Sequence, residues 1–374
     1  MPGLTIAPAV PHYVPAQPTK EALDYADLPI IDLAKAHSTP EDLQQLVVEV
    51  RNAMSTQGFL YVINHGYSPS QACHLDNSII PFLLNADIPE DEKKLYDAKS
   101  LETGRFRGYK LRQYWHIEGG VRDQLEQYNT NKNITRQTHP NAIRPFLPEI
   151  DAFAKHSHFN VVLPILRLLA IGLELSENTF VDMHDFASDG ESYVRFMKYY
   201  PRSEEDEIKS NNLWLKGHTD IGSLTLLYSQ PVAALQILGV DNRWRWVRHI
   251  ENAIIINLGD ALEFLSGGYY KATIHRVVQP PSDQRNVTRL GACYFNIPDG
   301  HVKLAPLTNS PVLQRVGVQQ RFGSDDNAPT MEEWRRGRVA AYGDPKTVWK
   351  AGEKRGEVKV DEKIVNGVVV KHYK

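Results

Sequence analysis

The sequence predicts a mainly β fold with flanking helices, and two features carry that prediction. Between about Tyr193 and Ile297 the chain consists of short runs rich in β-branched and aromatic residues, separated by Gly, Pro, Asn and Asp. Short strands broken by turn residues are typical of β-sandwiches and barrels. Outside this region apolar residues recur at helical spacing. We therefore expect a double-stranded β-helix, or jelly roll, with strands at 193–200, 223–228, 253–257, 271–278 and 289–296.

The helices are predicted from start signals and apolar spacing. Residues 39–42 combine a capping threonine, a proline in the first turn and two acidic residues, so a helix should start there and end near Gly58. Another helix is expected over 151–173, interrupted by Pro164, and a short one after Ser176. The capping-box pattern at 330–333 predicts a further helix near the C-terminus.

Composition narrows the functional class. The chain has 374 residues, 42% of them hydrophobic, and a formal net charge of −3, so it lacks the positive charge that would attract nucleic acid or an anionic membrane. No apolar run approaches the roughly 20 residues of a membrane span, and the stretch 1–19 lacks the apolar centre of a signal peptide. Only Cys73 and Cys293 are present, which indicates a reducing compartment without a disulfide framework. We expect a cytoplasmic protein with no obligate protein partner.

The strongest functional signal is the triplet His218-Thr219-Asp220, followed further along the chain by an isolated His275. In a strand alternate side chains share a face, so His218 and Asp220 can face a metal while Thr219 points away. Two imidazoles and one carboxylate on one side of an ion leave the opposite positions open, which is the arrangement used by non-haem Fe(II) oxygenases. We predict that His218, Asp220 and His275 bind Fe(II).

The surroundings of these residues resemble a known family. Residues 214–228 are similar to the metal-binding strand of the isopenicillin N synthase-like branch of the 2-oxoglutarate-dependent dioxygenases, which includes plant gibberellin and flavonoid oxidases. Segments 28–33, 58–66, 253–260 and 271–278 resemble the same family in the same order. Five motifs in one order make the resemblance specific. It implies that the protein uses Fe(II), 2-oxoglutarate as cosubstrate and O2.

The resemblance also implies how 2-oxoglutarate would be held. In that family an arginine, and a serine two residues later, bind the distal carboxylate, aided by a tyrosine on an earlier strand. Alignment on the aromatic pair 294–295 gives Arg289 the arginine position and Gly291 the serine position, and the tyrosine role falls to Tyr200. An arginine fork binds a carboxylate with two charge-assisted hydrogen bonds, so most of the recognition would survive the loss of the serine.

Three alternatives stay open at this anchor. Lys198 stands where the family has an asparagine, and its ammonium group could compensate for the absent serine. A second register would give the anchoring role to Arg285, whose separation from His275 is nearer to the family's usual spacing. The missing serine also leaves room for a 2-oxoglutarate-independent Fe(II) oxidase of the isopenicillin N synthase type, which takes all its electrons from the substrate.

The resemblance implies oxidation of a small organic molecule by hydroxylation, desaturation or cyclisation, in specialised metabolism. A protein that only binds a metabolite is disfavoured, because all three predicted metal ligands are present. The substrate pocket is predicted by position alone. Its candidate wall residues are Tyr109, Tyr114, Leu226, Tyr228 and Phe295.

These predictions together give one domain with four regions. Residues 1–27 are expected to form an irregular N-terminal arm, and 28–192 a mixed, mostly helical part. The jelly-roll metal-binding core is expected over 193–305, and a C-terminal extension with a helix over 306–374. In the family that the sequence resembles, C-terminal helices pack beside the cavity and help to select the substrate.

Overall fold

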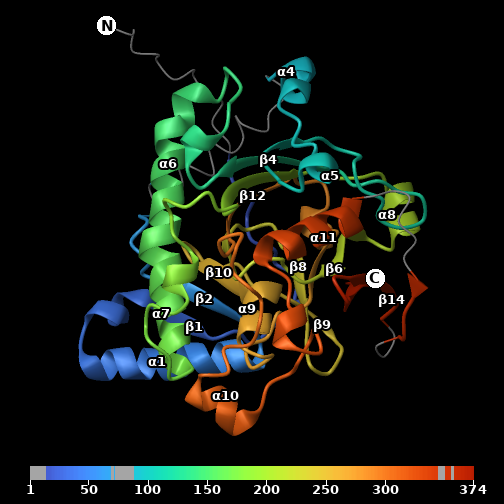
Figure 1. Cartoon of the computed structure of the whole chain (residues 1–374). Helices are drawn as coiled ribbons and strands as arrows, with labels where there is room; N and C mark the ends of the chain where they lie inside the picture. The colour runs from blue at the N-terminus through green and yellow to red at the C-terminus, as the bar shows by residue number, and fades with distance from the viewer. Residues whose placement is uncertain (1–13, 69–70, 72–87, 344–349, 355–357) are drawn as a thin grey trace, which may run out of the picture.

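Two β-sheets form the centre of the protein (Figure 1). The computed structural model describes residues 14–68, 71, 88–343, 350–354 and 358–374. Within these residues the larger sheet has eight strands in the order β1-β2-β10-β7-β12-β5-β4-β3, and the smaller has seven in the order β13-β14-β15-β6-β11-β8-β9. The predicted mainly β fold with flanking helices, a double-stranded β-helix, is confirmed.

The strand bounds agree with most of the predicted strands. The larger sheet consists of β1 (Ile30–Asp32), β2 (Phe59–Ile63), β3 (Gly108–Lys110), β4 (Leu125–Asn131), β5 (Tyr193–Tyr199), β7 (Leu224–Tyr228), β10 (Ile254–Leu258) and β12 (Arg289–Asn296). The smaller sheet consists of β6 (Leu213–His218), β8 (Leu235–Leu238), β9 (Trp244–Trp246), β11 (His275–Val278), β13 (Lys350–Ala351), β14 (Val360–Val365) and β15 (Val368–Tyr373). The strand predicted over 271–278 begins only at His275.

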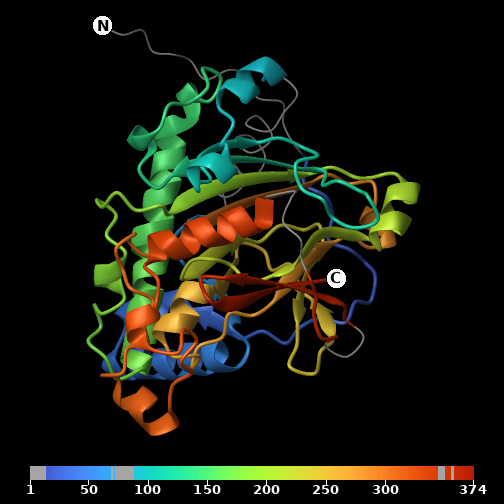
Figure 2. The same cartoon turned by 45° about the vertical axis from the view of Figure 1, so that its right-hand side comes forward.

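Helices cover the outer face of the larger sheet and one end of the molecule (Figures 1 and 2). They are α1 (Pro40–Thr56), α4 (Glu90–Leu95), α5 (Ser100–Thr103), α6 (Leu147–His156), α7 (Leu163–Gly172), α8 (Glu204–Ser210), α9 (Asp260–Leu265), α10 (Pro311–Val316) and α11 (Met331–Gly343). Helix α1 begins as predicted, because the Thr39 side chain accepts a hydrogen bond from the Asp42 backbone N–H. Within the described residues, no helix is both long and apolar enough to cross a membrane.

The predicted interruption at Pro164 does not break the helix. A π-helical turn, Ser157–Val162, joins α6 to α7, and Pro164 lies in the first turn of α7. Proline has no backbone N–H to donate, and a wider turn before it accommodates the missing α-helical bond. The helix predicted after Ser176 is wrong. Only a short 3-10 turn, Val181–Met183, forms there, because so few residues cannot offset the cost of nucleating a helix.

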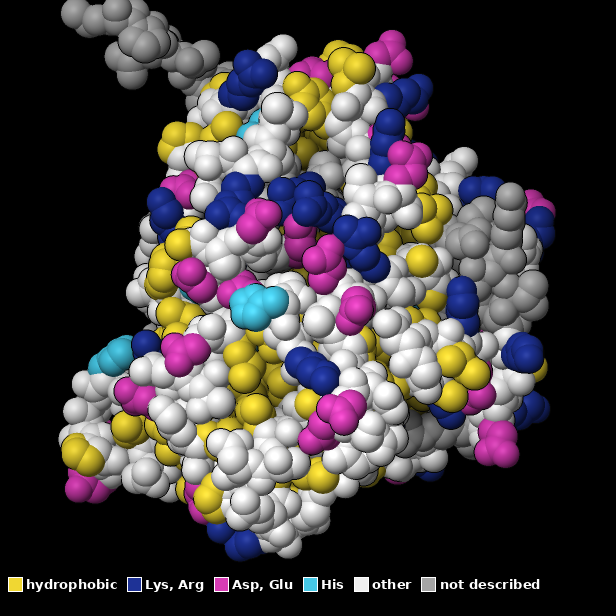
Figure 3. Space-filling view, viewed as in Figure 1, with side chains coloured by type: hydrophobic (Ala, Val, Ile, Leu, Met, Phe, Trp, Pro, Cys, Tyr) yellow, Lys and Arg dark blue, Asp and Glu magenta, His cyan; other side chains and the backbone are white. Residues whose placement is uncertain are grey.

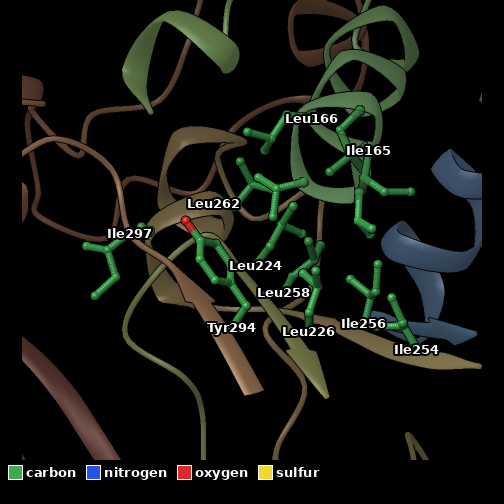
Figure 4. Close-up of a cluster of buried hydrophobic side chains, with 14 of the residues drawn as sticks. Ile165, Leu166, Leu224, Leu226, Ile254, Ile256, Leu258, Leu262, Tyr294 and Ile297 are labelled. Atoms are coloured by element: carbon green, nitrogen blue, oxygen red, sulfur yellow. The ribbon is translucent and has the colours of Figure 1, made fainter. Parts of the chain in front are cut away.

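The hydrophobic core lies between the larger sheet and α7 (Figure 4). Leu226 on β7, Ile256 on β10 and Tyr294 on β12 point toward Ile165 and Leu166 of α7, and all five are fully buried. Burying one such side chain contributes about 1.5–3 kcal/mol. The opposite face of the same strands is thereby left to line a cavity between the two sheets.

The C-terminal region contains more sheet than predicted. The predicted capping box is present, since the Glu333 carboxylate accepts from the Thr330 backbone and hydroxyl and Glu333 N–H donates to the Thr330 hydroxyl. Beyond α11, however, β14 and β15 form a hairpin, and Tyr373 of β15 pairs with Gly217 of β6 (Figure 2). The C-terminal extension thus adds strands beside the one that ends at His218. Of the predicted N-terminal arm, residues 1–13 lie outside the described residues, as does Cys73.

Candidate metal centre and cosubstrate cavity

His218, Asp220 and His275 converge at one end of the smaller sheet. Strand β6 ends at His218 and β11 begins at His275, and these two residues are directly paired. One candidate ligand atom from each of the three residues lies within 4.8 Å of the others. Asp220 Oδ1 is 3.8 Å from His218 Nε2, and its Oδ2 is 3.8 Å from His275 Nε2. Donors that share an ion lie about 2 Å from it, so these separations suit one metal ion.

Backbone carbonyls orient both imidazoles. His218 Nδ1 lies 2.8 Å from the Lys216 carbonyl oxygen, and His275 Nδ1 lies 3.2 Å from that of Thr273. A carbonyl can only accept, so each Nδ1 carries the hydrogen and each Nε2 keeps its lone pair. The ring nitrogens that face Asp220 are therefore the ones whose lone pairs suit a metal, as is usual for metal-binding histidines.

Two side chains outside the predicted set hold the carboxylate. Asp220 Oδ2 accepts a hydrogen bond of 2.7 Å from Thr225 Oγ1 and one of 2.8 Å from Asn257 Nδ2. Thr225 lies on β7 and Asn257 on β10, and the strand register pairs them directly. Neither residue was predicted to belong to the site. Their shared register could have been found only by pairing the two strands.

A second missed contact comes from the C-terminal helix. Arg338 of α11 forms a buried ion pair with Asp260, and its Nη2 donates a 3.0 Å hydrogen bond to the carbonyl oxygen of Thr219. Asp260 N–H in turn donates to the Asp220 carbonyl oxygen at 2.7 Å. The backbone between His218 and Asp220 is thus fixed from both sides.

The electrostatics of the cluster favour its metal-binding protonation state. Burial, reinforced by the neighbouring His275, lowers the pKa of His218 to about 4. Burial alone would raise the pKa of Asp220, but His275, His218 and the two hydrogen bonds lower it below its ordinary value. At neutral pH the site therefore offers a neutral imidazole and a carboxylate, which are the forms that bind metals. The donor set fits ferrous iron.

The three residues open into one large cavity between the two sheets. Its volume is about 1560 Å³, including the open mouth, and its wall is mainly aromatic and aliphatic. Three of the predicted substrate residues, Tyr109, Tyr114 and Phe295, line it. The other two predictions are wrong. Leu226 is buried in the core against α7 (Figure 4), and the Tyr228 hydroxyl lies 3.0 Å from Ser157 Oγ.

The predictions for Leu226 and Tyr228 chose the wrong face of strand β7. Side chains alternate along β7, and the neighbours of Leu226, Thr225 and Leu227, line the cavity instead of it. A shift of one position moves a side chain to the opposite face of the sheet. Only the pairing with neighbouring strands decides which set of alternate residues faces inward.

Arg289 lies at the far end of the same cavity from the metal candidates. It is the first residue of β12, only 3% exposed, and its guanidinium lies 5.4 Å from the ring centre of Tyr199, the residue opposite it on β5. Its Nε is buried without a hydrogen-bond partner, and no ion pair to Arg289 occurs among the described residues. Burial lowers the pKa of Arg289, yet an arginine remains charged. The group fits a carboxylate ligand.

The prediction for Tyr200 is wrong. Residues 195, 197 and 199 of the strand line the cavity, whereas the Tyr200 hydroxyl donates to Glu126 Oε2 at 3.1 Å and its ring packs under the guanidinium of Arg112. The motif match placed the tyrosine one residue too far along. Tyr199 takes the cavity position instead, because a step of one residue reverses the side chain's direction.

The alternatives for the anchor differ in their surroundings. Met197 pairs with Gly291, and its methyl group lies 3.4 Å from where a Cβ of residue 291 would stand, so an apolar group borders the position of the absent serine. Lys198 points away from the cavity, with its ammonium nitrogen 4.7 Å from the ring centre of Tyr200. Arg285 is half exposed and lies 4.0 Å from Glu204. Of the two arginines, the geometry favours Arg289.

Comparison with known proteins agrees with this arrangement. The family model described as 2OG-Fe(II) oxygenase superfamily matches residues 192–296, and the one described as non-haem dioxygenase in morphine synthesis N-terminal matches 28–148. Jasmonate-induced oxygenase 3 of Arabidopsis thaliana is 27% identical over 309 residues, covering 79% of this chain and 80% of the relative. Flavonol synthase 1 of Crocosmia x crocosmiiflora is 28% identical over 267 residues, covering 70% and 74%.

Solved structures show the same fold. A full-length protein of Neurospora crassa, crystallised in complex with alpha-KG and thymine, superimposes with a TM-score of 0.72 at 20% identity, covering 84% of this chain and 96% of that one. The two family models together span both the N-terminal region and the strands that carry His218, Asp220 and His275. The chain belongs to the 2OG-Fe(II) oxygenase superfamily, in its isopenicillin N synthase-like branch.

Proposed function

We propose that the protein is an Fe(II)- and 2-oxoglutarate-dependent dioxygenase that oxidises a small organic molecule. One observation carries the proposal: a single cavity holds His218, Asp220 and His275 at one end and the buried, unpaired guanidinium of Arg289 at the other. Such a cavity suits a dicarboxylate that reaches from a metal to a cation. Membership of the superfamily supports the same interpretation.

Each of these residues has a distinct task in the proposal. Ferrous iron, 2-oxoglutarate and O2 supply, when bound, the oxidising power that breaks a substrate C–H bond and yield succinate and carbon dioxide. His218 and His275 hold the iron through Nε2, and Asp220 holds it through its carboxylate. Arg289 holds the distal carboxylate of the cosubstrate with parallel N–H donors, and Tyr199 supports it. The apolar wall keeps water away from the reacting groups.

The substrate class and setting are inferred from relatives. A flavonol synthase and a Neurospora crassa structure that contains thymine support a small organic substrate. A role in specialised metabolism follows from the same relatives. Hydroxylation, desaturation and cyclisation all fall within the proposal, since the outcome depends on which C–H bond faces the metal. A cytoplasmic location is supported by the low cysteine content and by Cys293 being a free, buried thiol.

An oxidase that does not consume 2-oxoglutarate is the second candidate. The observation in its favour is that Gly291 and Met197 place no polar group beside Arg289 where the family pattern has a serine. Losing one hydrogen bond to a charged group costs about 1.5–3 kcal/mol, so Arg289 alone retains most of the anchor. The dioxygenase remains the better supported function.

Succinate release separates the two functions. Full-length protein supplied with Fe(II), 2-oxoglutarate and O2 is screened against a metabolite library for substrate-dependent oxygen uptake, and succinate is then measured for each hit. We expect succinate in step with product, none from Asp220→Ala, and wild-type amounts from Asp241→Ala, which alters an exposed carboxylate. If product formed without succinate, the protein would be the 2-oxoglutarate-independent oxidase and not the dioxygenase. Folded protein that binds no iron under anaerobic conditions would contradict both.

A further inference from the structure

Arg195 places a second buried guanidinium in the cavity. It lies on β5, opposite Cys293 on β12 and Asn129 on β4, and it lines the cavity with 9% of its surface exposed. Its Nε donates a 2.7 Å hydrogen bond to Asn129 Oδ1. Its Nη2 is buried and has no hydrogen-bond partner. Nε of this guanidinium is therefore held by the protein, while the N–H groups of Nη2 remain available as donors.

No acidic side chain among the described residues neutralises Arg195. Other cavity cations do have partners: Lys110 is 2.8 Å from Asp123, and Arg338 pairs with Asp260. On the surface seen in Figure 3, Lys and Arg side chains likewise lie among Asp and Glu side chains. The thiol of Cys293, opposite Arg195, cannot supply the charge, because burial raises its pKa to about 12. A buried charge without a counter-ion is costly.

The site at Arg195 is separate from the anchor at Arg289. Arg195 is paired with Cys293, which stands four residues beyond Arg289 on the same face of β12. At about 3.3 Å per residue the two positions lie about 13 Å apart along the strand. In the proposed complex the charges of ferrous iron, Asp220, the 2-oxoglutarate dianion and Arg289 cancel. The charge of Arg195 is left over in this sum.

Aromatic rings surround this remaining charge. The guanidinium carbon of Arg195 lies 4.8 Å from the ring centre of Phe295, 5.1 Å from that of Tyr193 and 5.3 Å from that of Phe106. Tyr193 and Phe295 are stacked at 4.7 Å with an angle of 15° between their planes. These cation–π contacts hold the guanidinium in place. The same rings, with Tyr109 and Tyr114, offer flat apolar walls that suit a ring-containing ligand.

We propose that Arg195 is a specificity-determining residue that binds a carboxylate on the substrate, and that the substrate is a monoanion with an apolar, ring-containing body. The inference rests on the proposed function and narrows its substrate class. Arginine suits this task, because its planar fork forms charge-assisted hydrogen bonds with a carboxylate. Asn129 and the aromatic rings act as positioning residues that fix the direction of the free N–H groups.

Paired acids and amides test the proposal. Full-length protein is loaded with Mn(II), which replaces iron without supporting turnover, and with 2-oxoglutarate. Benzoate, trans-cinnamate and 2-naphthoate are then titrated by calorimetry against their amides. At least one acid should bind about tenfold or more tightly than its amide, the size of a single charge-assisted hydrogen bond. Arg195→Gln should remove the preference, Arg195→Lys should keep part of it, and Arg107→Gln, which alters an arginine paired with Glu191, should keep all of it.

The outcomes are distinguishable. Equal affinity for acid and amide in all three pairs overturns the inference, as does acid binding that displaces 2-oxoglutarate and disappears in Arg289→Gln. If Arg195→Gln does not fold, the inference is tested by comparing the preference for acid over amide in the wild type with that in Arg195→Lys. Binding of 2-oxoglutarate is recorded in the same titrations. Protein that does not bind 2-oxoglutarate would count against the proposed function. Protein that binds 2-oxoglutarate but does not prefer the acids to their amides would contradict only the role assigned to Arg195.

Discussion

The metal site and the two unpaired arginines of the cavity satisfy their polar groups in opposite ways. At the metal end the protein itself supplies partners: Asp220 accepts from Thr225 and Asn257, and Arg338 bridges Asp260 and the Thr219 carbonyl. Elsewhere in the cavity Arg195 and Arg289, at positions about 13 Å apart along the sheet, keep buried nitrogens without partners. A metal needs ligands that are already oriented before it binds, while a charged ligand brings its own hydrogen-bond acceptors. The unpaired groups therefore mark where ligands other than metal are expected.

The largest effect should come from removing a metal ligand. His218→Ala and Asp220→Ala are expected to abolish succinate formation and iron binding, because two remaining donors no longer form the facial set. The fold should persist, since both residues lie at a strand end outside the main hydrophobic core. Iron content, succinate yield and circular dichroism check this. Retained turnover in a folded variant would show that these residues are not the ligands.

The next largest effect should distinguish two arginines. Arg289→Gln is expected to raise the KM for 2-oxoglutarate about a hundredfold, which corresponds to losing about 3 kcal/mol of charge-assisted hydrogen bonding. Arg285→Gln should leave the KM unchanged, because Arg285 is half exposed outside the cavity and lies near Glu204. Steady-state kinetics with varied 2-oxoglutarate provide the measurement. The opposite ranking would mean that the anchor has been assigned to the wrong arginine.

A smaller effect is expected where the protein orients the metal ligand. Asn257→Ala and Thr225→Val each remove one hydrogen bond to Asp220, and loss of such a partner typically weakens metal affinity about 10- to 100-fold. These bonds lower the pKa of Asp220, so their loss should raise it. Metal should therefore dissociate at a higher pH on acidification than in the wild type. Mn(II) titrations at several pH values would show this, with the exposed Thr308→Val as control; an unshifted curve would contradict it.

The sequence predicted the metal end better than the rest of the cavity. His218, Asp220 and His275 could be recognised because residue type, two-residue spacing and flanking motif all coincide in short segments. Arg289 could be placed because an aromatic pair fixed the alignment of its strand. Arg338 and Asp260 could not be joined, since nothing local indicates that a C-terminal helix packs beside the metal strand.

Most of the wrong site predictions chose a residue on the wrong face of a strand. Tyr200, Leu226 and Tyr228 were each assigned one step away from a residue that lines the cavity, and alternation turned each side chain outward. In a strand buried on both faces, hydrophobicity does not reveal which set faces the ligand. The C-terminal hairpin is a different case. Its Asn366-Gly367 turn, with both residues at positive φ, is a hairpin signal that was present in the sequence and was missed.

The smallest predicted effect tests the face of β5 directly. Tyr199→Phe removes the hydroxyl of a cavity-lining side chain whose ring centre lies 5.4 Å from the Arg289 guanidinium, and it should raise the KM for 2-oxoglutarate about fivefold, the equivalent of about 1 kcal/mol for one neutral hydrogen bond. Tyr200→Phe loses instead a hydrogen bond to Glu126 outside the cavity, so it should lower the unfolding midpoint slightly and leave the KM unchanged. The two substitutions are one position apart in the sequence, and each removes one hydroxyl group. A KM effect confined to Tyr200→Phe would return the tyrosine role to Tyr200 and would require β5 to present its other face to the cosubstrate. An effect confined to Tyr199→Phe would support the cavity face of β5 on which Arg195 also stands.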